Sequence, residues 1–131
     1  MIFIDSNIPM YLVGEKHPNK TRARELLDDC FDNNERLVTD VEVLQEILHR
    51  YDSIQRRDAI PPAFDLLEAT VDEVYAVDSE DIESAKEILL ASNRLSARDS
   101  LHLSVMRRYA VDRVMTFDEG IDLVPDIVRI Y

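Results

Sequence analysis

The amino-acid sequence predicts a three-layer α/β domain with a mainly parallel sheet of about five strands flanked by helices. Short β-type runs alternate with helical patterns along the chain, which is the order typical of a parallel sheet. The apolar runs do not alternate with polar residues, as expected for strands that are covered on both faces. With 131 residues, of which 46% are hydrophobic, the chain is predicted to form a single domain, residues 1–131, with a hydrophobic core.

Five short apolar runs are the predicted strands. They lie at residues 2–4 (IFI), 37–39 (LVT), 74–77 (VYAV), 114–117 (VMTF) and 127–131 (IVRIY). The predicted helices lie between them, at about residues 19–32, 41–54, 63–70, 79–92 and 97–110. A further short helix is predicted after SNIP at residues 6–9, where Pro9 suits a first turn. Pro61 and Pro62 end any helix that runs out of residues 41–60 and suit the start of the next one.

The charge balance of the chain is strongly acidic. It contains 12 Arg and 3 Lys against 16 Asp and 11 Glu, a formal net charge of −12 at pH 7. An Asp-rich and Lys-poor composition is typical of proteins that stay soluble in concentrated salt, although an ordinary acidic bias explains it equally well. Such a chain is not expected to bind nucleic acid non-specifically, so a site that acts on a polyanion needs positive charge from elsewhere.

No feature predicts secretion or insertion into a membrane. No apolar run approaches the roughly 20 residues that span a bilayer. The segment MIFIDSN lacks a basic region and acquires a charge at Asp5, so it does not resemble a signal peptide. The single Cys30 excludes an internal disulfide, and no cluster of Cys and His suggests a zinc site. A cytoplasmic location is therefore predicted.

An aspartate follows each of the first four predicted strands. These residues are Asp5, Asp40, Asp78 and Asp118. In open parallel sheets, sites form outside the carboxyl ends of the strands. Aspartate is also a favoured N-cap of the helix that follows a strand. Capping is the better interpretation for Asp40 and Asp78, because each precedes a clean amphipathic helix and has no further feature beside it.

Asp5 and Asp118 have more polar surroundings than the other two. Asp5 begins the polar run DSN directly after the first strand. Asp118 lies in TFDEGID, where Thr116, Glu119 and Asp122 add oxygen ligands close by. For these two aspartates, a capping role and a role in a site are equally open.

The last predicted helix carries a charge on its apolar face. A turn of about 100° per residue places Asp99 with Leu103, Met106 and Ala110. Ser96 and Asp99 resemble a capping box, and an acid in the first turn suits the helix dipole, but neither explains the apolar face. An unpaired buried charge costs several kcal/mol, and the arginines of this segment are predicted on other faces. A bound divalent metal would resolve the conflict.

The predicted helix at 41–54 supplies two further acids. Glu42 and Glu46 lie one turn apart on its flank, and Arg50 continues the row. Periodicity alone favours a surface pair between Glu46 and Arg50, four residues apart. It does not choose between the two glutamates as site residues.

Taken in order, these segments resemble the PIN-domain ribonucleases, especially the VapC-type toxins of toxin–antitoxin pairs. The matching segments are IFIDSN, VEVLQEILHRY, ARDSLHLSVMRRYAVDRVMTFDEGID and the terminal strand. Each motif alone is weak, but their order and spacing span nearly the whole chain. The resemblance implies the fold, the activity, the metal and the partners of that family.

The resemblance implies catalytic and metal-binding roles for four acids, Asp5, Glu46, Asp99 and Asp118. It favours Glu46 over Glu42, because an acid between VLQ and IL matches the helix of the family. Asn7 and Thr116 match supporting polar positions of the family. Asp122 is a weaker candidate for an outer contributor.

The same resemblance implies the cofactor and the partners. Mg²⁺ or Mn²⁺ is expected, because hard cations prefer oxygen ligands. The predicted partners are an RNA substrate, a VapB-like antitoxin that inhibits the enzyme and a second copy in a homodimer, with no membrane. His102 matches a common histidine of the family and is expected to pack rather than to act in catalysis. Four arginines are candidates to flank the RNA, with scattered solubilising charge as the alternative: Arg94, Arg98, Arg107 and Arg108.

The predicted function is therefore a divalent-metal-dependent endoribonuclease, the toxin of a type II toxin–antitoxin system. The alternative with the same fold is a catalytically silent RNA-binding or protein-interaction module. A signalling receiver domain fits poorly, because it needs paired acids after the first strand and a late lysine, and no lysine follows Lys86. A haloacid-dehalogenase-type phosphatase needs Asp-x-Asp there, and Asn7 occupies the second position.

Overall fold

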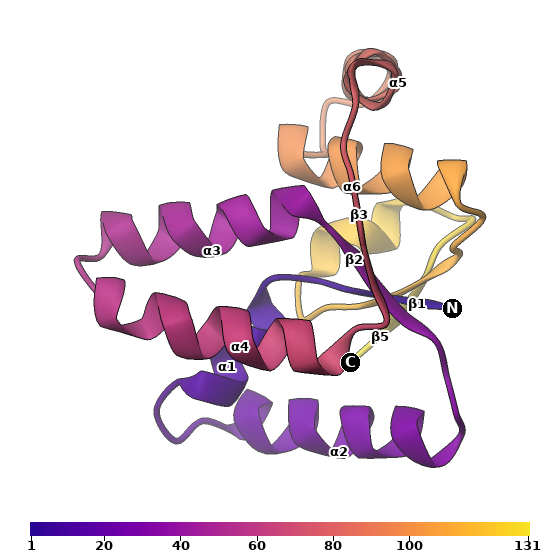
Figure 1. Ribbon diagram of the computed structural model, residues 1–131. Helices are drawn as coiled ribbons and strands as arrows, with labels where there is room; N and C mark the ends of the chain where they lie inside the picture. Colours follow the sequence, from indigo (N-terminus) through magenta and orange to yellow (C-terminus); the bar gives the residue numbers. More distant parts are fainter.

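The structure is a computed structural model that describes every residue from Met1 to Tyr131. Helices and strands alternate along the chain (Figure 1). Their bounds are β1 Ile2–Ile4, α1 Asn7–Val13, α2 Pro18–Asp32, β2 Leu37–Asp40, α3 Val41–Ser53, α4 Ile60–Thr70, β3 Glu73–Tyr75, α5 Ser79–Ala91, α6 Ala97–Arg108, β4 Arg113–Met115 and β5 Val128–Ile130. Two short 3-10 helices lie at Arg57–Ala59 (η1) and Glu119–Leu123 (η2).

The five strands form one parallel sheet in the order β3-β2-β1-β4-β5. The chain runs outward from β1 through β2 to β3 and then crosses back to β4, on the other side of β1. Phe3 of β1 therefore pairs with Val38 of β2 and Val114 of β4. The direction of winding reverses between β1 and β4, and ligand sites of open α/β sheets form at the carboxyl ends of strands at this point.

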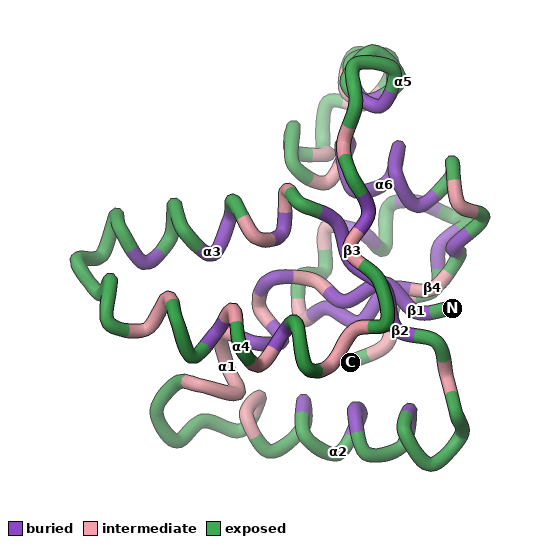
Figure 2. Tube along the Cα trace, in the orientation of Figure 1, coloured by how far each residue is buried: buried purple, intermediate pink, exposed green.

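Helices cover both faces of the sheet and complete three layers. In Figure 1, α2 lies below the strands and α6 lies above them, with α5 stacked on the far side of α6. The strands β1 and β2 are buried along their whole length, as Figure 2 shows in purple. This two-sided burial explains why their sequences are continuously apolar. No helix combines the length and the apolar character that a membrane span requires.

Every predicted strand and helix is present, with ends that differ by at most three residues. β1 coincides with the prediction, whereas β3 and β4 begin one residue early and end two residues early. The helix predicted at 63–70 begins at Ile60, because Pro61 and Pro62 fit into its first turn, where a missing N–H costs nothing. The fold class predicted from the sequence is confirmed.

The prediction for α6 was wrong in one respect. The helix ends at Arg108, and Ala110 is exposed with a φ of 55° beyond its end. Every residue from Ser100 to Met106 is buried, because α5 covers the side of α6 that faces away from the sheet. The helix therefore has no single apolar stripe. Asp99 lies in its first turn, just before the segment that is buried on all sides.

Candidate active site

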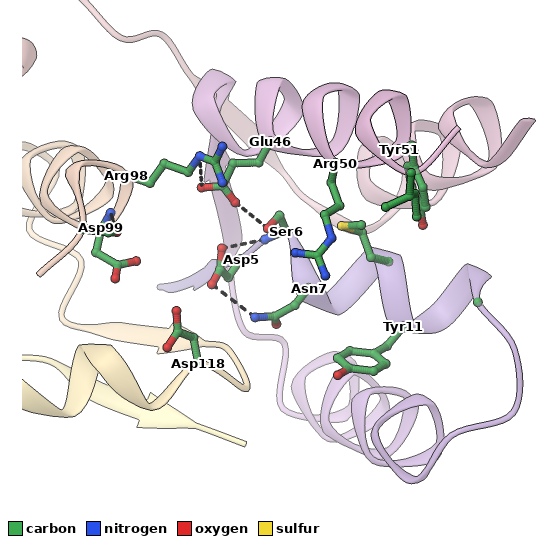
Figure 3. Close-up of a pocket in the computed structure, with 14 residues that line it drawn as sticks. Asp5, Ser6, Asn7, Tyr11, Glu46, Arg50, Tyr51, Arg98, Asp99 and Asp118 are labelled. Atoms are coloured by element: carbon green, nitrogen blue, oxygen red, sulfur yellow. Dashed lines mark hydrogen bonds and ion pairs between the residues drawn. The ribbon is translucent and has the colours of Figure 1, made fainter. Parts of the chain in front are cut away.

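A cavity of about 480 Å³ opens at the carboxyl ends of β1 and β4. The four acids implied by the family resemblance all line it: Asp5, Glu46, Asp99 and Asp118. Figure 3 shows their carboxylates facing a common space from four separate segments. The acids come from the turn after β1, from α3, from the first turn of α6 and from the turn after β4. The parallel topology brings these segments together although they are far apart in the sequence.

Asp5 is held by residues from both ends of the chain. Its Oδ1 accepts a hydrogen bond of 2.7 Å from the backbone N–H of Ser6, and its Oδ2 accepts one of 2.6 Å from Thr116 Oγ1. Asn7 Nδ2 donates to Thr116 Oγ1 over 3.0 Å, and the backbone N–H of Asp118 donates to the same hydroxyl over 3.0 Å. Burial raises the pKa of the Asp5 carboxyl above its ordinary value. Asn7 and Thr116 therefore lie where the resemblance implies, in contact with the acids.

Glu46 belongs to a chain of buried hydrogen bonds and forms no pair with Arg50, the surface partner that periodicity favoured. Ser6 Oγ donates to its Oε2 over 2.5 Å, and His102 Nε2 lies 2.9 Å from its Oε1. The other ring nitrogen of His102 lies 2.8 Å from Asp40 Oδ2. Asp40 also caps α3, because its Oδ1 accepts from the backbone N–H of Val43. The predicted capping role of Asp40 is correct but incomplete.

His102 is the positive charge at the centre of this chain. Burial of the imidazole alone would lower its pKa, but the hydrogen bonds to Asp40 and Glu46 raise it well above the ordinary value. The two ring nitrogens lie 2.8 and 2.9 Å from carboxylate oxygens, an arrangement that favours the doubly protonated imidazolium. Burial also acts to raise the pKa of Glu46, but the hydrogen bond and the charge of His102 outweigh it and hold that pKa below the usual range. The expectation that His102 serves only in packing is therefore incomplete.

Asp99 and Asp118 converge on one point from opposite segments. A Cβ added at Gly120 would lie 3.2 Å from Asp118 Oδ1 and 3.5 Å from Asp99 Oδ2. Burial raises the pKa of Asp99, and the neighbouring charges of Asp118 and Asp5 raise it further. The sequence analysis left capping open for Asp118, and one of its oxygens does cap η2 by accepting from the backbone N–H of Gly120.

Two other acids named from the sequence lie outside the cavity. Asp122 forms a two-bond ion pair with Arg129, at 2.8 and 2.9 Å, and does not line the cavity. Both of its oxygens accept from Arg129, and its role as an outer contributor stays a prediction. Glu42 is also absent from the lining, whereas Glu46 points inward from the same helix. Asp78, predicted to be a cap, forms a capping box with Asp81 at the start of α5.

The four arginines that were predicted to flank the RNA do not lie together around the cavity. Of the four candidates, only Arg98 lines the cavity, where its Nε lies 3.7 Å from Glu46 Oε1. Arg107 pairs with Asp126, and Arg108 pairs with two acids at the start of α5, so both are directed away from the acidic cluster. Arg94 is exposed and does not line the cavity.

The donor set fits a divalent cation that prefers oxygen ligands. The nearest ligand atoms of Asp5, Glu46 and His102 lie within 4.8 Å of one another. His102 has no free lone pair while both of its nitrogens donate, so the donors on offer are carboxylate oxygens. Asp99 and Asp118 face the same space, and neither they nor Asp5 form an ion pair. Such a set of like charges is typical of a Mg²⁺ or Mn²⁺ site.

Four residues that line the cavity were not predicted from the sequence to belong to a site. Ser6 links Asp5 to Glu46, and its only signal was its place inside the polar run DSN. Arg50 was interpreted as a partner of Glu46, but it lines the cavity and forms no ion pair. Tyr11 and Tyr51 also line the cavity, and no pattern in the sequence distinguished them from core aromatics.

The chain belongs to the PIN-domain family, because the family profile matches residues 2–127. The particular relatives are VapC proteins. The chain is 53% identical over 130 residues, 99% of either chain, to the VapC ribonuclease Mb1869c of Mycobacterium bovis and to ribonuclease VapC13 of Mycobacterium tuberculosis. It is 38% identical to ribonuclease VapC23 of M. tuberculosis over 118 residues, which are 90% of this chain and 93% of that one.

Solved structures of toxins have the same fold. The crystal structure of VapC20 from M. tuberculosis, described as a toxin that cleaves the sarcin–ricin loop, matches with a TM-score of 0.78 at 21% identity over 94% of both chains. VapBC2 of Rickettsia felis, solved with a DNA fragment from its promoter, matches with a TM-score of 0.73 at 16% identity. That match covers 99% of this chain and 98% of the other. At these identities the likeness extends to the fold alone.

Proposed function

We propose that residues 1–131 form a single-domain, divalent-metal-dependent endoribonuclease that acts in the cytoplasm as the toxin of a type II toxin–antitoxin pair. One observation carries the proposal: four carboxylates from four segments face one cavity at the carboxyl ends of β1 and β4. Membership of the PIN-domain family and the high identity to VapC ribonucleases support the choice of RNA as the substrate.

In this proposal the role of the protein is to hold the carboxylate oxygens that bind the metal in fixed positions. Ser6 and Thr116 fix both oxygens of Asp5, and His102 with Ser6 fixes Glu46. Asp99 and Asp118 supply the opposite wall, where their mutual repulsion favours a bound cation. The four acids would hold a Mg²⁺ or Mn²⁺ ion there, which would supply Lewis-acid activation of the phosphate and of the attacking water. The buried histidine keeps Glu46 ionised.

The proposed partners follow from the same assignment. An antitoxin of the VapB type is expected to inhibit the enzyme by placing a basic side chain among the four acids, and the toxin is proposed to form a homodimer. A structural neighbour from Klebsiella pneumoniae is described as a toxin–antitoxin complex, which supports a partner of this kind. Co-expression with any small open reading frame found next to the gene tests it, since growth should recover only when toxin and antitoxin are made together.

The test of the nuclease compares two aspartates four residues apart. RNA cleavage is measured with Mg²⁺ or Mn²⁺ and with EDTA, using total RNA and sequencing of the new ends. Asp118→Asn should lower the rate by at least about 100-fold, because it removes a proposed ligand. Asp122→Asn should leave the rate unchanged, because Asp122 pairs with Arg129 outside the cavity. Metal-independent cleavage, or equal loss in the two variants, would contradict the proposed site.

A further inference from the structure

The cavity continues beyond the four acids into a half that the proposed cleavage chemistry does not use. This aromatic half is walled by Met10, Tyr11, Tyr51 and Ile54, and Arg50 projects between it and the acids (Figure 3). We propose that the aromatic half is a subsite for one unstacked base of single-stranded RNA, next to the phosphate that is cut. The inference rests on the proposed nuclease function and adds to it the residues that would read the substrate.

Tyr51 supplies the first observation, a hydroxyl that lacks a partner within the protein. The residue lines the cavity and is only 7% exposed. No side-chain oxygen or nitrogen that is fully closed off lacks a partner, so this hydroxyl is open to solvent. Its hydrogen-bonding capacity is therefore free for a ligand, and every nucleobase has an edge that can use it.

Tyr11 supplies a ring in a fixed position. It packs edge to face with Phe117, with centroids 5.4 Å apart and an angle of 87°, and it lies 4.9 Å from the ring of His17. Phe117 immediately precedes Asp118, and its backbone N–H donates to Asn7 Oδ1 over 3.3 Å. The ring that would stack on a base is therefore anchored to the same turn that carries one of the acids. A base on Tyr11 would place its own backbone beside the metal-binding end.

Arg50 supplies the positive charge that a nucleotide requires. Only two cations line the cavity, and the other one, Arg98, faces Glu42 and Glu46 at 4.0 and 3.7 Å. Arg50 forms no ion pair, so its guanidinium is free to contact a phosphate. It would repel a basic side chain from a protein partner, and this favours RNA as the occupant of this half. The volume of about 480 Å³ falls in the usual range for small ligands, roughly 300–1,000 Å³.

Binding of short RNA tests the subsite separately from cleavage. The probes are fluorescein-labelled octamers of A, of C and of U, and binding is measured by fluorescence anisotropy in Mg²⁺. All proteins carry Asp99→Asn so that the RNA stays intact. Tyr11→Ala should weaken binding of every octamer by about ten-fold, as expected for the loss of one stacked base. Tyr11→Phe retains the ring and should bind within about two-fold of the parent.

The hydroxyl of Tyr51 should act on base preference rather than on overall affinity. Tyr51→Phe should change the ratios of affinity among the three octamers. Tyr75→Phe is the matched control, because Tyr75 is 5% exposed and lies outside the cavity. Arg50→Ala should reduce the slope of log affinity against log salt by about 0.7, the value for one phosphate contact. Arg24→Ala, an exposed arginine of α2 without an ion pair, should not change this slope.

The outcomes of this test do not depend on the cleavage experiment. Weaker binding by Tyr11→Ala together with altered ratios in Tyr51→Phe would establish the subsite, whichever RNA is cut. Binding of no octamer by the parent protein would overturn it. Unchanged affinity in Tyr11→Ala, or unchanged ratios in Tyr51→Phe, would equally overturn it and leave the aromatic half as packing or as a surface for a protein partner. Loss of cleavage alone bears on the nuclease and not on the subsite.

Discussion

At the scale of single residues, the candidate site depends on a charge that solvent does not reach. His102 lies between Asp40 and Glu46, so one imidazolium balances two buried carboxylates. Glu46 is in this way kept ionised at the edge of the cavity. His102 thus fixes the position of Glu46 through a hydrogen bond. Replacing His102 is therefore expected to affect the stability of the fold, and not only catalysis.

Replacing His102 should destabilise the fold strongly. His102→Gln leaves two buried carboxylates without their cation, which should cost on the order of 3 kcal/mol of unfolding free energy in urea titrations. The folded pKa is raised, so the stabilisation is complete below the unfolded pKa of about 6.5 and is lost as the pH rises through the folded pKa. The penalty should therefore be larger at pH 6 than at pH 10. His49→Gln, on the exposed side of α3, is the control and should cost little.

Neutralising Asp99 should have the opposite effect on the metal-free protein. Its raised pKa means that its stabilising contribution is present below the unfolded pKa and is lost as the pH rises. Asp99→Asn should thus raise the melting temperature in EDTA at pH 7, by about 3 °C, and change it little at pH 3. The variant should also lose the increase that Mg²⁺ is expected to produce in the wild type. Asp112→Asn, on an exposed turn, should do neither.

The sequence identifies the acids of the site better than it identifies their supports. Asp5 and Asp118 directly follow predicted strands, and the strand topology alone brings such positions together. The choice of Glu46 over Glu42 came from the resemblance, because both lie on the same flank of the helix. The double role of Asp40 was beyond sequence reasoning. One of its oxygens caps α3 as predicted, and the other meets a histidine 62 residues away, a contact that only the folded chain defines.

At the scale of secondary structure, the start of α6 decides where Asp99 lies. Ser96 caps the helix by accepting a hydrogen bond of 3.0 Å from the backbone N–H of Asp99. Ser100 Oγ donates to the carbonyl of Ser96 over 2.9 Å and closes the same turn. The first turn of α6 is thus stabilised locally at the point where it delivers a carboxylate to the cavity.

Removing this cap should weaken both the helix and the metal site. Ser96→Ala should cost about 1 kcal/mol of stability and lower the affinity for Mg²⁺, because the turn that carries Asp99 is loosened. Asp78→Ala is the matched control, since it removes the cap of α5 on a helix that does not reach the cavity. It should lower stability to a similar degree while Mg²⁺ affinity, measured by titration calorimetry, is unchanged. Equal losses of affinity would show that the cap of α6 has no special part in the site.

Sequence patterns predict secondary structure well here, except where tertiary packing decides. The strands are visible because they are short, apolar and enclosed. The helix α6 is different, since its residues from Ser100 to Met106 are buried on all sides and include two serines and a histidine. Its polar residues are accommodated by partners elsewhere, as when Ser104 Oγ donates to the carbonyl of Asp81 over 2.8 Å. Periodicity cannot predict the buried face of such a helix, because α5 also buries the side of α6 that faces away from the sheet.

At the scale of the whole molecule, the net charge of −12 limits how RNA is bound. Most arginines near the site are already paired with acids, and only Arg50 and Arg98 line the cavity. The long-range electrostatic attraction between the protein and RNA is therefore weak. The remaining charge contacts with phosphates are those that Arg50 and Arg98 can make inside the cavity.

The salt dependence of RNA binding should therefore be shallow. With one or two phosphate contacts, the slope of log affinity against log salt should lie between about −0.7 and −1.4 for single-stranded RNA in constant Mg²⁺. Anisotropy titrations from low to multimolar KCl measure it. A slope of −4 or steeper would reveal a basic surface outside the cavity and contradict this account.

The position of β1 in the middle of the sheet has a consequence for how the protein is made. β1 emerges from the ribosome before β4, which pairs with it on one side, and Asp5 needs Thr116 and Asp118 from that later region. The 113 residues from Asp5 to Asp118 take roughly 6–23 s to translate at 5–20 residues per second. During that interval the nascent chain has no complete set of acids. A nascent chain is therefore not expected to cleave RNA until synthesis has passed the fourth strand.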